Sequence, residues 1–447
     1  MSPAPERSAG PRWPADARGQ ALALLSAVFE DRMTLDAALA AEPGLARLAP
    51  RDRAFARLMT VTVLRRLNQL DRLIDTLMER PLPRRQMRVR TILRLGAAQM
   101  VFLDTPPHAA VNGAVDLARA VGVGGMRNLV NAVLRRIASG DRATQRQLAS
   151  PGENTPDWLW QRWRAAYGED TAAAIAASHL TEPPLDLTVN GPRIADPQAF
   201  AATLDAELLP TGSLRRKGGG AVTDIPGYAA GDWWVQDAAA ALPARLLGDV
   251  AGKSVVDLCA APGGKTAQLA AAGARVTAVD VAPARLALVE ANLARLGLAA
   301  DCVAADAAEW RPPAKADAVL LDAPCTATGT LRRHPDIAWL KSPRDIAVTV
   351  AMQDRLLDAA AEMLAPGGTL VYAVCSLLPE EGVERIAALL DRNAALERLP
   401  MAASELAGFD GLAPPAITSD GDLRTLPCHF AERGGMDGFY AARLSHR

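Results

Sequence analysis

Cysteine and histidine are scarce in this chain: each occurs five times among 447 residues, and no two cysteines form a C-x-x-C pair. This scarcity excludes a disulfide framework and argues against a zinc site. Long apolar runs are also missing. None approaches the roughly 18 residues that span a membrane, and residues 1–19 lack the apolar stretch of a signal peptide. We therefore expect a cytoplasmic protein with no metal ion and no membrane partner.

Lysine is absent from residues 1–150, which hold 23 arginines and 13 acidic residues for a net charge of +10, whereas the rest of the chain carries −11. A basic domain joined to an acidic one is typical of proteins whose basic part binds nucleic acid. A solvated helical surface encoded by a GC-rich genome would show the same excess of arginine. Charge alone leaves both interpretations open.

The chain is too long for one ordinary core, and its pattern changes along its length. Residues 1–17 contain four prolines, and we expect them to be disordered. Apolar residues recur at helical spacing through 18–140, which predicts an all-α domain of six or seven helices. The polar stretch 141–156 is typical of a linker.

A small α/β insert is expected at 157–226. Alternating apolar and polar residues predict a strand at 185–190, and a helix is expected at 197–206. Residues 214–217 are basic and lead into three glycines. We interpret them as a flexible loop that grips phosphates.

Residues 227–447 alternate between short apolar runs and helical segments. Strands are predicted at 254–258, 275–279, 301–304, 318–321 and 368–372, and helices at 265–272, 283–297 and 345–365. This alternation indicates a doubly wound parallel sheet.

The first of these strands runs into a glycine-rich turn, residues 257–266, at the start of a helix. Gly263 and Gly264 let the backbone approach a ligand, and the helix presents free N–H groups there. The spacing is neither that of a Walker A loop nor G-x-G-x-x-G. Asp280 at the end of the next strand could bind ribose hydroxyls, and Asp306 could meet an adenine amino group. Together, the glycine-rich turn, Asp280 and Asp306 favour a site for S-adenosylmethionine over a dinucleotide site or a turn that is purely structural.

Two cysteines 50 residues apart, Cys325 and Cys375, each follow a predicted buried strand. The carboxyl ends of parallel strands meet at one sheet edge, so the two thiols suggest one covalent nucleophile and one helper. A thiolate that adds to C6 of cytosine makes C5 reactive toward a methyl group, and the thiolate is a good leaving group afterwards. Asp322 could hydrogen-bond the base at N3 and N4, and Lys265 could orient Asp322. Buried cysteines are often only small apolar residues, but the Asp-Ala-Pro-Cys and Cys-Ser contexts favour chemistry here.

These motifs closely resemble the bacterial Sun/RsmB group of RNA cytosine-C5 methyltransferases. The matching segments are 257–266, 322–336 (DAPCTATGTLRRHPD), 371–381 (VYAVCSLLPEE) and the C-terminal 434–440, and residues 90–112 and 128–136 resemble the NusB-like RNA-binding domain fused to these enzymes. The resemblance spans nearly the whole chain. It implies an all-α NusB-like domain, a small α/β insert that extends the RNA-binding surface, and a Rossmann-like S-adenosylmethionine-dependent methyltransferase domain at 227–447.

The resemblance also implies which residues act. Cys375 matches the nucleophile, and Cys325 matches the cysteine that assists resolution of the adduct. The implied cofactor contacts are Cys259, Ala260, Ala261, Pro262, Gly263, Gly264, Lys265, Asp280, Asp306 and Asp322. The usual substrate is a cytosine in 16S rRNA, either free or in a small-subunit assembly intermediate, and we expect a monomeric enzyme.

The chain departs from the family pattern at a few positions. Many members have Ser-Gly where this chain has Thr326-Ala327, Thr where it has Val374, and Asn where it has Gly382. None of these changes removes a reacting group. Residues 332–334, Arg-Arg-His, are expected either to touch RNA or to serve the structure.

Three other functions compete with this one. The core motifs leave methylation of tRNA or another RNA open. A DNA cytosine methyltransferase is less favoured, because its Pro-Cys cysteine is itself the nucleophile and no second Cys-Ser motif is expected. A non-catalytic RNA-binding or antitermination protein is disfavoured because both cysteines and both cofactor acids are present.

Overall fold

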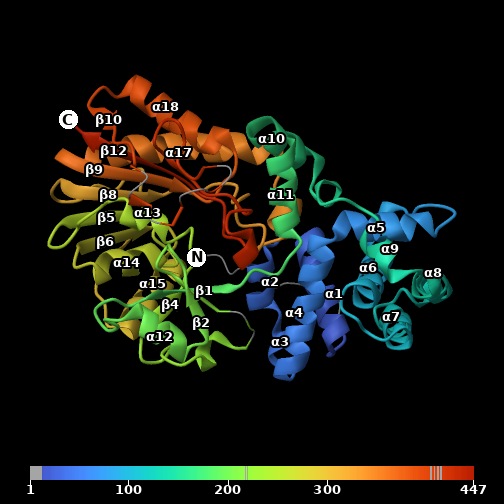
Figure 1. The fold of residues 1–447 in the computed structure, drawn as a ribbon. Coiled ribbons are helices and arrows are strands. Elements are labelled where there is room, and N and C mark those ends of the chain that lie inside the picture. The colour runs from blue at the N-terminus through green and yellow to red at the C-terminus, as the bar shows by residue number, and fades with distance from the viewer. Residues whose placement is uncertain are drawn as a thin grey trace, which may run out of the picture. The chain divides into compact units, whose positions relative to one another are not determined.

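The computed structural model describes residues 13–447 apart from 217, 219, 403, 404, 407, 410, 411, 413 and 414. Two compact units make up the fold (Figure 1): the chain up to Gln161 together with His334–Lys341, and Arg162–Arg333 together with Ser342–Arg447. Most of the N-terminal segment that we expect to be disordered lies outside the described residues. The first helix begins at Ala17, where Asp16 accepts a hydrogen bond of 2.8 Å from the Gly19 N–H.

The first unit is helical, as the apolar spacing predicts. Its helices are α1 (Ala17–Phe29), α2 (Leu35–Ala41), α3 (Pro43–Ala46), α4 (Pro50–Arg65), α5 (Leu67–Thr76), α6 (Met87–Val101), α7 (Pro107–Ala120), α8 (Arg127–Ser139), α9 (Arg142–Arg146) and α16 (Ile337–Leu340), and α10 (Asp157–Tyr167) begins here. Among the residues that the structure describes, the predicted helical domain at 18–140 holds eight α-helices instead of six or seven, because α2 and α3 are only seven and four residues long, and α9 lies in the stretch predicted as a linker. Proline opens α3, α4 and α7, where its missing N–H has no helical acceptor to lose.

A short piece of the C-terminal half belongs to this helical unit. Within His334–Lys341, Trp339 packs against the helical core, and its indole N–H donates to the carbonyl of Leu64 at 2.9 Å. The Asp336 carboxylate accepts a hydrogen bond of 2.9 Å from the Leu35 N–H. The sequence pattern gave no sign of this arrangement, since these contacts join residues about 300 positions apart.

A four-stranded antiparallel sheet opens the second unit. Its strands are β1 (Leu185–Val189), β2 (Ala206–Leu208), β3 (Leu214–Arg216) and β4 (Trp233–Val235), in the order β2-β3-β1-β4. The helices of the same region are α11 (Glu169–His179) and α12 (Pro197–Thr203). The strand and helix predicted in this insert are therefore present, and β2, β3 and β4 are additional.

The prediction of a flexible basic loop at 214–217 was wrong. Leu214–Arg216 forms β3, which pairs with β1, and Arg215 is only 1% exposed. Its guanidinium donates to both oxygens of Asp186 at 2.6 and 2.7 Å. Because a buried carboxylate neutralises this cation, Arg215 is not a phosphate-binding group. Lys217 lies outside the described residues.

A large sheet of eight strands follows in the second unit. Its strands are β5 (Ser254–Leu258), β6 (Arg275–Asp280), β7 (Asp301–Ala304), β8 (Ala316–Asp322), β9 (Leu364–Val374), β10 (Leu396–Arg398), β11 (Leu423–Arg424) and β12 (Tyr440–His446). Its helices are α13 (Leu242–Arg245), α14 (Gly264–Ala271), α15 (Pro283–Leu296), α17 (Pro343–Met363) and α18 (Val383–Arg392). All five predicted strands and all three predicted helices are present, with ends shifted by a few residues.

The sheet is mixed instead of wholly parallel. The strand order is β10-β12-β9-β8-β5-β6-β7, and β11 pairs with β12. The five strands from β9 to β7 are parallel, whereas β10, β11 and β12 run antiparallel to their partners. The last strand, β12, covers the outer edge of β9, which would otherwise present unpaired backbone groups. This addition corrects the prediction of a parallel sheet.

Alternate residues of the parallel strands face two apolar layers. Val255 packs in the layer that holds Leu242 of α13 and Leu269 of α14, whereas Val256 packs in the layer with Leu356 of α17 and residues of α18. Figure 1 shows the helices that cover the sheet. The strand order reverses direction between β5 and β8. In open α/β sheets, ligands bind beyond the carboxyl ends of the strands at this switch point.

Candidate active site

The two cysteines meet beyond the carboxyl ends of β8 and β9. These strands are parallel neighbours in which Asp322 pairs with Ala373. Cys325 and Cys375 follow shortly afterwards, and their Sγ atoms lie 3.5 Å apart, within reach of a thiol hydrogen bond. The structure thus brings together the two thiols that the sequence predicted at this edge.

Three loops are joined by backbone hydrogen bonds around the thiols. We call them the Pro-Cys loop (residues 322–330), the Cys-Ser loop (373–381) and the C-terminal loop (434–439). The Gly329 N–H donates to the Cys375 carbonyl at 2.9 Å, and the Gly438 N–H donates to the Gly329 carbonyl at 2.8 Å. A Cβ at Gly329 would lie 1.9 Å from the Gly438 oxygen, so only glycine allows this approach.

A buried carboxylate, Glu381, lies beneath both cysteine loops. It accepts hydrogen bonds from the Thr326 N–H at 2.8 Å, the Thr326 hydroxyl at 2.5 Å and the Ser376 hydroxyl at 2.5 Å. From α17, the Thr349 hydroxyl donates at 2.6 Å and the Gln353 amide at 3.4 Å. Sequence reasoning missed Glu381, although its place five residues after Ser376, next to a second glutamate, was visible.

The thiol of Cys325 is strongly affected by these surroundings. Its hydrogen bond to Cys375 and its burial raise the pKa of Cys325 well above the ordinary value, and the nearby charge of Glu381 raises it further. The Ala327 N–H opposes this shift by donating toward the sulfur. Cys325 is therefore held as the protonated thiol near neutral pH.

The glycine-rich turn after β5 has the expected geometry. Cys259 and Gly263 adopt left-handed backbone conformations, with φ of 61° and 98°. The Thr266 hydroxyl donates to Asp257 at 2.6 Å. Asp257 is completely buried, which raises its pKa to about 7. Burial, together with the charges of nearby carboxylates, raises the pKa of Cys259 to about 12, since both disfavour the thiolate. Cys259 is therefore an unreactive thiol that lines the turn.

Lys265 and Asp322 form an ion pair at the switch point. Lys265 Nζ lies 2.7 Å from Asp322 Oδ2 and 5.2 Å from the centre of the Phe439 ring. The Lys265 side chain is 9% exposed, whereas that of Asp322 is 31% exposed. The ion pair therefore orients Asp322, as predicted for Lys265, and leaves the Asp322 side chain partly exposed.

Asp280 and Asp306 follow adjacent strands but differ in burial. Asp280 is 2% exposed, and its two oxygens accept hydrogen bonds from the N–H groups of Ala261 at 3.1 Å and Ala282 at 3.0 Å. Asp306 is exposed and accepts a hydrogen bond of 2.9 Å from the Ala308 N–H. Each carboxylate keeps lone pairs for a further donor.

These groups fit S-adenosylmethionine. The first N–H groups of α14, from Gly264 to Thr266, have no intrahelical acceptors and suit a carboxylate. Asp280 suits a ribose diol. The one lysine of the turn, Lys265, already pairs with Asp322, so it offers no cation to a pyrophosphate. The donor set therefore favours an adenosine ligand that carries an amino-acid group and no phosphates.

The three residues of the Arg332-Arg333-His334 segment lie in different surroundings. Arg332 is 1% exposed and pairs with Asp237 at 3.1 Å and Asp437 at 3.5 Å, which is a structural role. Arg333 also pairs with Asp437, but its side chain is 31% exposed. His334 belongs to the helical unit and lies 3.3 Å from Asp36.

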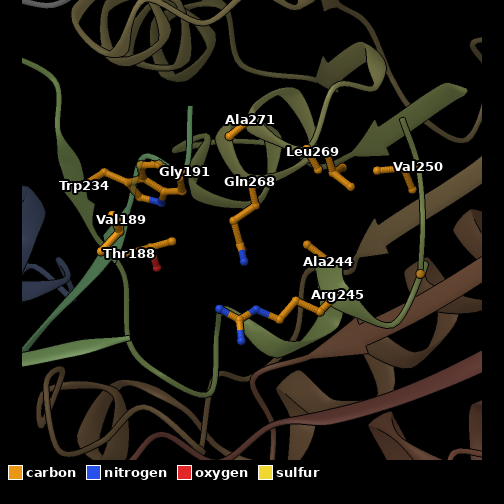
Figure 2. A pocket seen from close by; sticks show the side chains of 12 residues that line it. Thr188, Val189, Gly191, Trp234, Ala244, Arg245, Val250, Gln268, Leu269 and Ala271 are labelled. Carbon is orange, nitrogen blue, oxygen red and sulfur yellow. The ribbon is translucent and has the colours of Figure 1, made fainter. Parts of the chain in front are cut away.

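Figure 2 shows a pocket of about 380 Å³ elsewhere in the second unit. Thr188 and Trp234 of the small sheet line it, together with Arg245 and Gln268. None of the predicted cofactor or catalytic residues lines this pocket. It is therefore not the site that the motifs define.

The fold and the site together define a Rossmann-like methyltransferase. Within the described residues, no helix is both long and apolar enough to cross a membrane. In the same part of the chain, no cluster of three metal-binding side chains occurs.

Comparisons with known proteins identify the family within this class. Residues 244–445 match the family described as 16S rRNA methyltransferase RsmB/F, residues 15–139 match the NusB family, and residues 155–211 match the RsmF/B-like, ferredoxin-like domain. The crystal structure of the protein PH0851 shares the fold, with a TM-score of 0.74 at 21% identity, and covers 96% of this chain and 98% of its own.

Two curated relatives are similar over most of their length. The probable ribosomal RNA small subunit methyltransferase B of Synechocystis is 34% identical and covers 92% of this chain and 94% of its own. The ribosomal RNA small subunit methyltransferase B of Citrobacter koseri is 36% identical, with coverage of 89% and 92%. The chain belongs to this RsmB/F family of ribosomal RNA small subunit methyltransferases.

Proposed function

We propose that the protein methylates C5 of a cytosine in 16S rRNA through a covalent bond between Cys375 and C6 of the base. The observation that carries the proposal is the meeting of two thiols 3.5 Å apart with Asp322, whose carboxylate is held by Lys265 at the same sheet edge. One thiol can act as nucleophile and the other as an acid–base group.

The chemistry balances with the groups present. The Cys375 thiolate adds to C6, and the C5–C6 π electrons become available at C5, which takes the methyl group as the bond between that methyl and the donor sulfonium breaks and the thioether leaves. The C5 proton then leaves to a base, the electrons re-form the C5–C6 bond, and the S–C6 bond breaks to return the thiolate. Cys325 assists this elimination, and Asp322 holds N3 and N4 of the base so that C6 faces the thiolate.

The methyl donor is S-adenosylmethionine, which supplies an electrophilic methyl group when bound. We assign its contacts to Asp280, Asp306, Asp322 and the turn from Cys259 to Lys265. In this assignment, Asp280 binds the ribose and the start of α14 binds the carboxylate of the donor. A base extruded from the RNA stack then reaches the thiol pair.

RNA binding is assigned to the helical domain at 18–140, with a supporting role for the extension at 157–226. Among the clustered arginines, Arg94 pairs with Asp71 at 2.6 Å and Arg90 pairs with Asp75 at 2.6 Å. Because these carboxylates neutralise them, both arginines are less available to bind phosphates. Helix α8 is a better candidate, because it exposes Arg135 and Arg136 and its sequence contains no acidic residue. Binding should weaken steeply as salt rises, and a flat salt dependence would contradict this assignment.

The remaining assignments follow the same proposal. We expect a monomer that acts in the cytoplasm, with the linker at 141–156 between the RNA-binding domain and the rest. A cytosine in tRNA is the competing substrate, because the chemistry at the thiol pair is the same for both RNAs.

Methylation of defined RNAs tests the function. Unmodified 16S rRNA and tRNA would each be incubated with the protein and labelled S-adenosylmethionine, then digested to nucleosides and analysed by mass spectrometry. The proposal predicts 5-methylcytidine in 16S rRNA and none in tRNA. Label at cytosine N4, or in tRNA alone, would contradict it. Asp322→Asn should lower the rate by about 10²-fold, and Asp317→Asn, an exposed aspartate of the same strand β8, is the matched control.

A further inference from the structure

The two thiols of the pair lie in unequal electrostatic surroundings. The carboxylate of Glu381 accepts hydrogen bonds from five neutral donors: two come from Thr326, the residue after Cys325, and one comes from Ser376, the residue after Cys375. After the hydrogen bond to Cys375 and burial, the charge of Glu381 also raises the pKa of Cys325. A carboxylate is an acceptor-only group, so this donor set matches the ionised form. Glu381 is completely buried, so its negative charge is poorly screened by solvent.

Positive charge lies on the Cys375 side. The Arg424 guanidinium is 8% exposed and donates to the carbonyl of Ser376, the residue after Cys375, at 2.5 Å. Arg333 is a second cation. It pairs with Asp437. Burial lowers the pKa of Arg333, whereas the charges of Asp437 and Asp237 raise it, and a charge on Cys375 adds to them.

We propose that Glu381 is a positioning residue that makes the thiols unequal: its charge keeps the shared proton on Cys325 and leaves Cys375 as the thiolate. The step moves only a proton, since the Cys325 S–H donates to the Cys375 sulfur across 3.5 Å and no other bond changes. The charged and titratable groups around the pair include Glu381 and Tyr372, which act on Cys325, Arg333 with its partner Asp437, Arg424 on the Ser376 carbonyl, and the Lys265–Asp322 ion pair at the same sheet edge. This inference rests on the proposed roles of the two cysteines.

Site-resolved alkylation of the full chain tests the inference without RNA or cofactor. A short iodoacetamide pulse at pH 7.5, followed by peptide mass spectrometry, gives separate rates for Cys325 and Cys375. The thiolate is the reacting form, so in the wild type Cys375 should react at least tenfold faster. A faster reaction at Cys325 would overturn the proposal with no variant needed.

Two variants then isolate the charge. Glu381→Gln keeps the shape and removes the charge, and should lower the Cys375:Cys325 rate ratio by about tenfold, the change for one pKa unit. Thr349→Val removes one hydrogen bond to the same carboxylate and should leave the ratio unchanged. An unchanged ratio in Glu381→Gln, or an equal loss in Thr349→Val, would overturn the proposal.

Should Glu381→Gln fail to fold, Arg333→Met tests the same asymmetry from the other side and should slow alkylation at Cys375. An unchanged rate there would count against the proposal. Because alkylation needs no substrate, a protein that methylated no cytosine could still show the asymmetry. Failure of the proposed function is therefore separable from failure of this inference.

Discussion

The Pro-Cys loop and the Cys-Ser loop begin at paired residues of neighbouring strands, yet they are held in different ways. Both loops bind Glu381, the first through Thr326 and the second through Ser376. The first depends in addition on its backbone: Ala327 has a left-handed φ of 57°, and Gly329 packs directly against the C-terminal loop. The second depends in addition on Arg424, which donates to the Ser376 carbonyl. The comparison teaches that substitutions at Ala327 and Gly329 should act through strain, and those around Ser376 through lost polar contacts.

The largest effect is expected at Gly329. In Gly329→Ala the new Cβ would lie 1.9 Å from the Gly438 oxygen, so the backbone of one loop must move. We expect a loss of about 1–3 kcal/mol in the free energy of unfolding and a fall in methylation of about 10²-fold, since a displacement near 1 Å has that cost. Chemical denaturation and a methylation assay measure both.

Gly191→Ala is the matched control, because a Cβ there meets nothing within 4 Å. Wild-type activity in Gly329→Ala would show that the close approach of the two loops is not required.

The next effect is expected at Gly382, where many family members have asparagine. A Cβ at this position would lie 2.8 Å from Arg424 Nη2 and 3.1 Å from Tyr440 Cγ. Gly382→Asn should displace Arg424 from the Ser376 carbonyl and lower methylation by roughly tenfold, about the worth of one hydrogen bond to a charged group.

A double-mutant cycle with Arg424→Ser checks the cause. The two substitutions should be clearly non-additive, because each disturbs the same contact. Additive losses would mean that Gly382 acts elsewhere.

The smallest effect is expected at Ala327. A left-handed conformation costs a residue with a side chain roughly 1–2 kcal/mol. Glycine avoids this cost, but it loses more conformational entropy on folding, which offsets part of the gain. Ala327→Gly should therefore stabilise the fold by up to about 1 kcal/mol and leave methylation within about twofold, which thermal unfolding and the same assay measure. Ala305→Gly, at a position with an ordinary φ, should destabilise slightly. A loss of stability in Ala327→Gly would show that the left-handed conformation of Ala327 does not strain this loop.

Local signals predicted much of the fold. Apolar runs bounded by glycine or proline fixed all five parallel strands within a few residues, because both signals lie within the strand and its flanks. The meeting of Cys325 and Cys375 followed from one rule about parallel strands. The all-α character of the N-terminal half followed from helical spacing.

Features that depend on distant partners could not be predicted. β12 was not predicted, although it is seven residues long, and it pairs antiparallel with the edge of β9. Arg215 belongs to a basic stretch in the sequence, but Asp186, 29 residues away, neutralises it. Trp339 packs in the helical unit through contacts with residues that lie far earlier in the chain. Glu381 escaped notice for the same reason, since its donors come from three separate segments.

The most direct test of the central claim, that Cys375 is the nucleophile and Cys325 assists elimination, compares covalent adducts. Wild type, Cys375→Ala and Cys325→Ala would be incubated with unmodified 16S rRNA and labelled S-adenosylmethionine, and the products run on a denaturing protein gel. The account predicts a labelled protein–RNA band for Cys325→Ala, and neither band nor methylation for Cys375→Ala. Methylation by Cys375→Ala, with an inert Cys325→Ala that forms no adduct, would contradict it and make the Pro-Cys thiol the nucleophile.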